Sequence, residues 1–267
     1  MTAPAPTVLT VSDHAPNALF ELLQRLGDDR LILGHRVSEW CGHGPILEED
    51  IALANIALDL IGQSTMLLHL AGQVEGKGRD EDALAYFREA VEFRNCQLVE
   101  LPNGDFAFTI ARQFLFDVYS VVLLDSLTHS AHADVAAIAV KALKEAKYHV
   151  RHSGDWMLKL GDGTDESHRR VQRALDELWR FTPELFAPDD IDRALLMARI
   201  GPDLDALHTQ WEALVLEVLD RATLTVPHAL PRRANARSAR QGFHTEHLGH
   251  LLAEMQSVAR SHPGAGW

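Results

Sequence analysis

The stretch Ile51-Ala-Leu-Ala-Asn-Ile-Ala-Leu-Asp59-Leu-Ile-Gly-Gln63 is apolar on nearly every side of a helix, yet it carries an ionisable side chain. Such a segment is typical of a central helix covered by neighbours on most faces. An isolated carboxylate inside a protein costs several kcal/mol unless it is protonated, paired or bound to a metal. We therefore expect Asp59 to be buried and to have partners on other helices.

Apolar residues recur at three- and four-residue spacing along most of the chain, which predicts helices. The four longest patterns cover about residues 17–41, 47–70, 106–129 and 135–160. Shorter patterns follow at about residues 82–100, 167–181, 191–200, 204–222 and 245–259. No alternation of period two is long enough for a strand. The sequence predicts an all-α protein whose long helices are joined by short, antiparallel connections.

Each long helix carries one carboxylate among apolar residues. These acids are Glu39, Asp59, Asp117 and Glu145. One inward acid per helix is the carboxylate half of a di-iron bundle, in which two helices also supply Glu-x-x-His pairs. We therefore predict a ferritin-like four-helix bundle with additional C-terminal helices. We expect a loose leader at 1–14 and one domain at 15–267, with a core bundle at about 15–161 and peripheral helices at about 164–260.

The histidines that would complete a di-iron site are absent from the required positions. The residues three after the acids are Gly42, Gly62, Ser120 and Tyr148. His149 stands four residues after Glu145, out of register for a shared metal. We therefore expect no metal and no catalytic residue in this chain, and a vestigial site filled by salt bridges. Arg36 is a candidate partner for Glu39, and Lys141 for Glu145; the alternative is that some of these acids face solvent.

Composition narrows the class of protein. The chain has 267 residues, 46% of them hydrophobic and 24% charged, and a formal net charge of −13, which argues against nucleic acid or an anionic membrane as a general partner. With two cysteines and no basic, apolar leader we expect a cytoplasmic protein. Two local groups of cations stand out against the negative net charge. They are Arg232, Arg233, Arg237 and Arg240 in one late loop, and Lys141, Lys144, Lys147 and Arg151 along one helix.

Several motifs resemble the structural C subunits of bacterial phenylacetyl-CoA 1,2-epoxidases over about residues 16–267. They are Val37-Ser-Glu-Trp-Cys-Gly-His43, Ile51 to Gln63, Leu98-Val-Glu-Leu-Pro-Asn-Gly-Asp-Phe106, Thr109-Ile-Ala-Arg-Gln113, Lys144-Glu-Ala-Lys-Tyr-His149, Leu178-Trp-Arg-Phe-Thr182 and His244-Thr-Glu-His-Leu-Gly249. The resemblance implies a ferritin-like subunit that does not itself hold iron and that supports aerobic phenylacetate breakdown.

The resemblance also implies partners and cofactors. In that family a paralogous A subunit holds the di-iron site and epoxidises the ring of phenylacetyl-CoA, and a reductase supplies electrons from NADPH through a flavin and an iron-sulfur centre. The structural subunit is expected to pair with itself and with the A subunit. Part of the acyl-CoA contact region is expected at Glu92, Phe93, Arg94 and Asn95 and at Arg193, Ala194 and Leu195.

Two other classes of function stay open on the residues alone. The chain could be a di-iron or di-manganese enzyme in its own right, using the four acids with His149, or a helical adaptor unrelated to oxygenases. Metal analysis separates the enzyme from the scaffold, and co-purification with an A-type subunit separates the adaptor.

Overall fold

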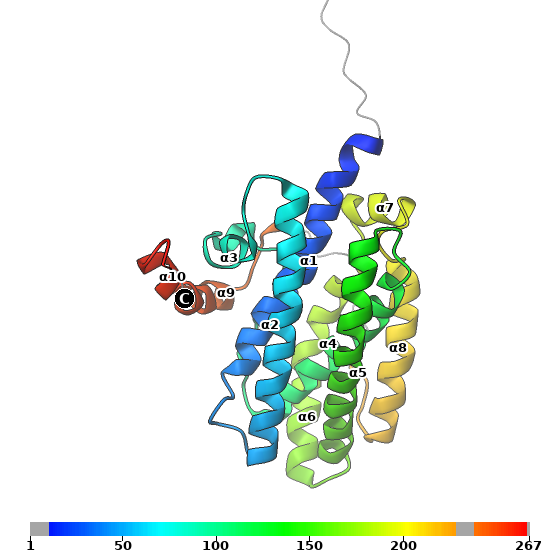
Figure 1. Ribbon diagram of the computed structural model, residues 1–267. Helices are drawn as coiled ribbons and strands as arrows, with labels where there is room; N and C mark the ends of the chain where they lie inside the picture. Colours follow the sequence, from blue (N-terminus) through cyan, green and yellow to red (C-terminus); the bar gives the residue numbers. More distant parts are fainter. Residues whose placement is uncertain (1–10, 228–237, 266–267) are drawn as a thin grey trace, which may run out of the picture.

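The structure is a computed structural model that describes residues 11–227 and 238–265, and every regular element in those ranges is a helix. Four long helices lie side by side as a bundle (Figure 1). They are α1 (Val11–Ser38), α2 (Leu47–Glu75), α4 (Phe106–Leu127) and α5 (Ala133–Gly161). The prediction of an all-α, ferritin-like bundle is confirmed. The first ten residues of the predicted leader lie outside the described residues, and α1 begins at Val11, earlier than expected.

Helix α2 is one turn longer than the sequence pattern predicts. Acidic Glu48, Glu49 and Asp50 in its first turn favour the positive end of the helix dipole. The helix continues past Gly72 and ends at Gly76, which has a left-handed φ of 67° and closes the last turn. Gly72 is a packing site and not a helix end, because a Cβ there would overlap the carbonyl group of Arg79.

Helix α4 is the core of the bundle. Asp105 caps its first turn by accepting a hydrogen bond from the Phe108 amide. Among the described residues, α2 and α4 are long and apolar enough to cross a bilayer by length and composition. In α4, 89% of the most apolar window is buried inside the fold, whereas the figure for α2 is 44%. Helix α2 therefore presents part of its apolar surface outward.

The helix predicted for residues 82–100 is wrong in its second half. The chain forms α3 (Glu81–Tyr86) and then two 3₁₀ turns, η1 (Ala90–Glu92) and η2 (Gln97–Glu100). Two carboxylates on α1 explain the change. Asp28 accepts the backbone N–H of Arg94, and Asp29 accepts that of Cys96, at 2.8 Å and 2.7 Å. Because these amide groups bond to α1, they are not available for a helix ladder.

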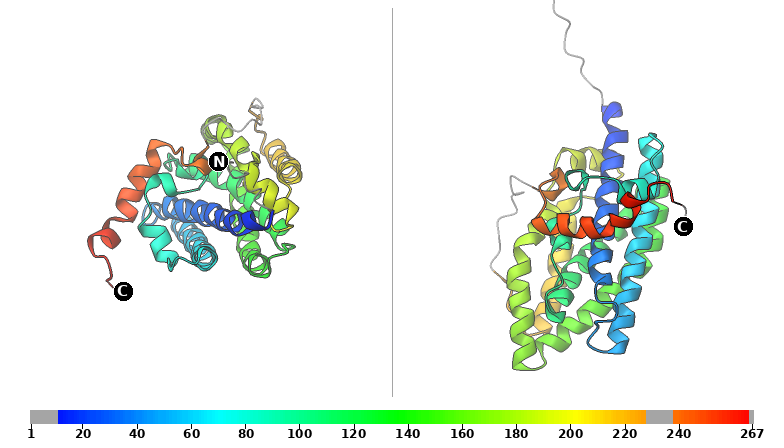
Figure 2. Two further views of the ribbon diagram at one scale, coloured as in Figure 1. Left: turned by 90° about the horizontal axis from the view of Figure 1, so that it is seen from above. Right: turned by 90° about the vertical axis from the view of Figure 1, so that its left-hand side faces the viewer.

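The C-terminal elements surround the bundle. They are α6 (Asp165–Leu178), η3 (Trp179–Phe186), α7 (Asp190–Met197), α8 (Leu204–Arg221), η4 (Ala239–Gln241), α9 (Glu246–Met255) and α10 (Ser257–Ser261). Helices α6 and α8 pack on α4 and α5, α7 packs on α1, and Figure 2 shows α9 and α10 extending across the side of the bundle. The expected additional C-terminal helices are therefore present. The division into a core and a periphery within one domain stays a prediction.

Candidate functional site

The interior between the four long helices holds a row of polar side chains at the place where a ferritin-like protein binds metal. At its upper level, Arg30 of α1 is fully buried. Its Nε donates to Gln63 Oε1 at 2.9 Å, and Gln63 Nε2 donates to Glu145 Oε2 at 2.8 Å. Burial lowers the pKa of the Arg30 guanidinium. Gln63 thus connects a buried cation on α1 to a carboxylate on α5.

One turn below, α2 and α5 are joined by a carboxylate and an imidazole. His149 is buried, and its Nε2 lies 3.0 Å from Asp59 Oδ2. The Asp59 side chain is 37% exposed. The prediction that Asp59 has a partner on another helix is confirmed, but the prediction that it is buried is wrong. The helix turns this residue to the boundary between interior and solvent, where water also covers the carboxylate.

Asp117 is the acid that the bundle buries completely. Its carboxylate on α4 accepts a hydrogen bond from Ser153 Oγ of α5 at 2.8 Å. Loss of hydration raises the pKa of Asp117 to about 6, although the nearby His149 and the Ser153 hydrogen bond act in the opposite direction. The structure therefore stabilises the neutral form of this acid.

A third polar level lies toward the lower end of the bundle. His152 Nε2 of α5 lies 2.8 Å from Glu49 Oε2 of α2, and both side chains are nearly buried. One turn before Asp117 on α4, Gln113 is 1% exposed. Its amide oxygen and nitrogen have no hydrogen-bonding partner among the described residues. A buried, unsatisfied amide of this kind destabilises a fold or binds ordered water.

Two expectations about the acids are wrong. Glu39 lies just past the end of α1 and points outward, with 45% of its side chain exposed. Lys141 makes no ion pair with Glu145 in the described part of the chain, and its ammonium group contacts the Met66 sulfur at 3.5 Å. The predicted Arg36–Glu39 pair is confirmed at 2.8 Å. The geometry thus brings together Asp59, Asp117, Glu145 and His149, and leaves Glu39 outside.

These residues do not fit a di-iron site. No group of three or more His, Cys, Asp and Glu side chains is placed to hold a metal ion in residues 11–227 and 238–265. Asp59, Asp117 and Glu145 each accept a hydrogen bond from a different neighbour, namely His149, Ser153 and Gln63. Tyr148 is 45% exposed on the outside of α5, so it does not complete the set.

A second polar region fastens the outer face of α1 to the later chain. Asp28 is fully buried and accepts both terminal nitrogens of Arg88, one of them at 3.0 Å. Asp29 accepts Arg240 Nη2 at 2.7 Å. Of the predicted arginine-rich loop, Arg240 is thus a structural cation, and residues 228–237 lie outside the described residues. Charge pairs this well buried fix the position of the segments that carry them.

The first predicted acyl-CoA region lies next to this network. Phe93 and Asn95 are fully buried, and the Arg88 guanidinium lies 4.2 Å from the centre of the Phe93 ring. Glu92 is exposed and bonds to the backbone N–H of Glu89. Arg94 Nη1 donates to the carbonyl groups of Val91 and Phe93, both at 2.8 Å. Of these four residues, only Glu92 and Arg94 present a charged group at the surface.

The second predicted region is the middle of α7. Leu195 is buried, Ala194 is half-buried and Arg193 is 60% exposed. Arg193 Nη2 bonds to Asp190 Oδ1 at 3.0 Å, and Asp190 is almost fully exposed. The helix is held on α1 by Arg25, which contacts both acids of its capping box, Asp189 at 2.5 Å and Asp192 at 3.2 Å.

Sequence reasoning missed the residues that balance the interior charges. They are Arg30, Gln63, Ser120, Ser153, His152 and Glu49. The run Asp28-Asp29-Arg30 within an otherwise apolar helix carried a signal, because three charged residues in a row on a buried helix require partners. Gln63 ends the apolar stretch quoted first, but an amide gives no sign of which helix it faces.

The fold and this interior agree with the relatives of the chain. Residues 4–267 match the family described as "Phenylacetic acid catabolic protein". The chain is similar to the C subunit of the 1,2-phenylacetyl-CoA epoxidase of Escherichia coli (strain K12), with 48% identity over 251 residues, which are 94% of this chain and 100% of that protein. The match spans both the bundle and the C-terminal helices. The predicted resemblance is confirmed, and the chain belongs to the family of phenylacetic acid catabolic proteins.

Proposed function

We propose that this chain is a non-catalytic structural subunit of a phenylacetyl-CoA 1,2-epoxidase, a multicomponent monooxygenase of aerobic phenylacetate catabolism. In this proposal it pairs with itself and with a di-iron A subunit, which performs the ring epoxidation. The di-iron centre belongs to the A subunit, and the NADPH, flavin and iron-sulfur chemistry belongs to the reductase. The complex works in the cytoplasm without nucleic acid or membrane partners.

The observation that carries the proposal is the internal balance of charge where iron would bind. Arg30 supplies a buried positive charge, and Gln63 connects it to Glu145. A metal pair at this level would have to replace that connection and bring further positive charge beside a fully buried guanidinium. The interior is thus suited to hold four helices in place and not to exchange ligands during a reaction.

The test is co-expression of this chain with the A-type subunit, followed by mass measurement of the complex and iron quantitation of each separated subunit. We expect a stable complex, iron in the A subunit and no stoichiometric iron in this chain. Iron in near-stoichiometric amount in the chain alone would support the alternative of a di-metal oxygenase. Failure of the A subunit to associate would support an adaptor with another partner.

We also propose that Arg94 and Arg193 contribute guanidinium groups to phosphate oxygens of the acyl-CoA. Support comes from Arg193, because its ion pair with Asp190 is exposed to solvent and worth little, so the group is available to a ligand. In the assembled complex, Arg193→Gln should raise the KM for phenylacetyl-CoA while leaving kcat unchanged. Arg173→Gln, an exposed arginine of α6, is the control. An unchanged KM would contradict this role of Arg193.

A further inference from the structure

The outer surface of α2 and α5 combines apolar and basic side chains in an unusual way. Along α2, Leu47, Ile51 and Leu58 are 72%, 53% and 67% exposed. Along α5, the exposed residues on the same side are Lys141, Lys144, Tyr148 and Arg151. We call the surface formed by these seven residues the α2–α5 face, and it lies toward the viewer in Figure 1.

The contacts between the two helices show that both rows lie on one surface. Asp59–His149 and Gln63–Glu145 join α2 to α5 in the interior. Leu58 and Tyr148 each precede a residue of the first pair, and Lys144 precedes Glu145. Because the helices are antiparallel, a step of one residue back turns the side chain on either helix toward the same outer side.

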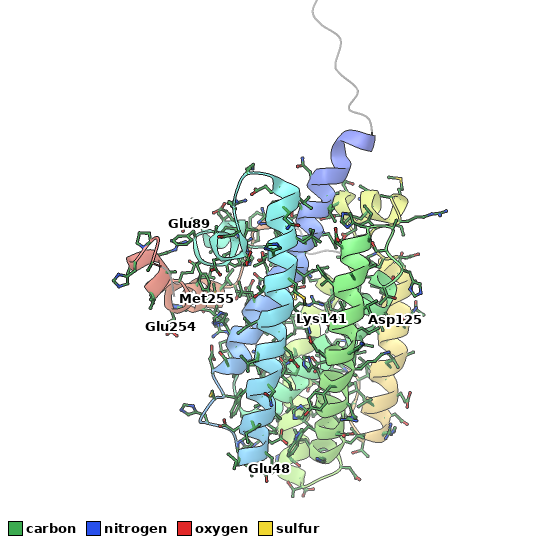
Figure 3. All side chains as sticks on the ribbon, viewed as in Figure 1. Glu48, Glu89, Asp125, Lys141, Glu254 and Met255 are labelled. Carbon is green, nitrogen blue, oxygen red and sulfur yellow. The ribbon has the colours of Figure 1, made fainter. Side chains whose placement is uncertain are left out.

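A shallow groove of about 380 Å³ continues this surface upward. It is lined from α2 by Thr65, Met66, His69, Leu70 and Gln73, from α3 by Glu81, and from α5 by Asp134, Ala137 and Ile138. Lys141 lies at its lower end, where its ammonium group meets the Met66 sulfur, and Figure 3 shows Lys141 between α2 and α5. The two rows therefore belong to a continuous interhelical surface.

The cations of this face have no carboxylate partner among the described residues. Arg151 lies over the Tyr148 ring, 5.5 Å from its centre, and Lys144 makes no ion pair in that part of the chain. The acids beneath the face are Asp59 and Glu145, which bond to His149 and Gln63. An unpaired row of positive charge is notable on a protein whose formal net charge is −13.

Charge argues against a second copy of this chain as the occupant. A twofold axis perpendicular to the helices would place the α5 cations against the same cations of the other copy. An axis parallel to the helices would place those cations against Ile51 and Leu58. Neither arrangement pairs a cation with a carboxylate, and an isologous interface has to be self-complementary.

We infer that the α2–α5 face binds the catalytic A subunit through a helical ridge whose apolar row is flanked by carboxylates. This inference rests on the proposed function, because it names the surface that serves the proposed partner. The apolar row from Leu47 to Leu58 and the cations from Lys141 to Arg151 each extend about 15 Å, or three helical turns. A ridge of three turns would cover the leucine side chains and meet the cations at its edge.

The experiment measures the affinity of variants for the purified A subunit. Leu58→Asp and the double variant Lys144→Glu/Arg151→Glu should each weaken binding by about tenfold or more. Leu214→Asp on α8 (where Leu214 is 43% exposed) and Arg173→Glu on α6 are the matched controls and should bind as the wild type does. Far-UV circular dichroism and melting curves verify that each variant is folded.

The outcomes separate the inference from the proposed function. If the wild-type chain does not bind the A subunit, the proposed function fails. If the wild type binds and the face variants bind equally well, only this inference is overturned. It is also overturned if Leu58→Asp abolishes a dimer of the isolated chain, or if it abolishes cosedimentation with vesicles of phosphatidylcholine and phosphatidylglycerol.

Discussion

Replacing Asp117 by Asn should stabilise the protein at neutral pH and leave its stability at acidic pH nearly unchanged. Burial raises the pKa of Asp117 from the ordinary 3.8 to about 6 in the folded chain. Its contribution is fully favourable below the unfolded-state pKa and is lost as pH rises through about 6. Since one pKa unit corresponds to about 1.4 kcal/mol, the ionised carboxylate costs the fold about 3 kcal/mol above pH 7.

The asparagine keeps the native geometry, because its Oδ1 can accept the hydrogen bond that Ser153 donates to the carboxylate. Urea unfolding at pH 4, 6 and 7.5 measures the effect. The free energy of unfolding of Asp117→Asn minus that of wild type should grow from near zero to about 3 kcal/mol across this range. Asp125→Asn, an exposed change near the end of α4, should show no such trend.

One outcome would refute this reasoning about Asp117. If Asp117→Asn is less stable than wild type at pH 7.5, and the difference does not change with pH, the carboxylate is held ionised in the folded state. A positive group near it, such as the His149 imidazole, would then outweigh the cost of burial.

Three further changes test other parts of the structure. Asp28→Asn should cost about 3 to 5 kcal/mol in urea unfolding, because it leaves the buried Arg88 guanidinium without a counter-charge; a loss below about 1 kcal/mol would contradict this. Gln113→Met should be neutral or stabilising by up to about 2 kcal/mol in the same assay, since it removes an unsatisfied amide, whereas a clear loss would show that water satisfies that amide. Gly72→Ala should lower the melting temperature, because the new methyl group would overlap the Arg79 carbonyl, and Gly62→Ala, which meets open space, is the control.

Local rules predicted the helices well because the apolar spacing and the helix caps are encoded close together in the sequence. The start of α2 at Leu47 and of α4 at Phe106 follow from acids in the first turn and from the Asp105 cap. The end of α3 did not follow from local rules, since it depends on Asp28 and Asp29, which lie more than 50 residues away. Long-range hydrogen bonds of this kind override helix propensity.

The acids show the limit of sequence reasoning about a buried site. Asp117 and Asp59 both stand among apolar neighbours in the sequence, yet one is 1% exposed and the other keeps 37% of its side chain in contact with solvent. The difference lies in the helices, because α4 is surrounded by others and α2 has one open side. An apolar helix with an open side was indistinguishable from a buried one until its neighbours were placed.

That open side gives a physical reason for the conflict between the two surfaces of α2. Its inner residues Gln63 and Asp59 complete hydrogen bonds that hold α1 and α5. Its outer residue Leu58 gains nothing within this chain, and exposing a leucine forgoes about 1.5 to 3 kcal/mol of burial. A helix whose polar groups point inward and whose leucines point outward is ordered by its own chain on one side and is suited to a protein partner on the other. The same inversion explains why the interior needs no metal to hold the bundle together: the bonds that α2 makes inward already connect three of its four helices.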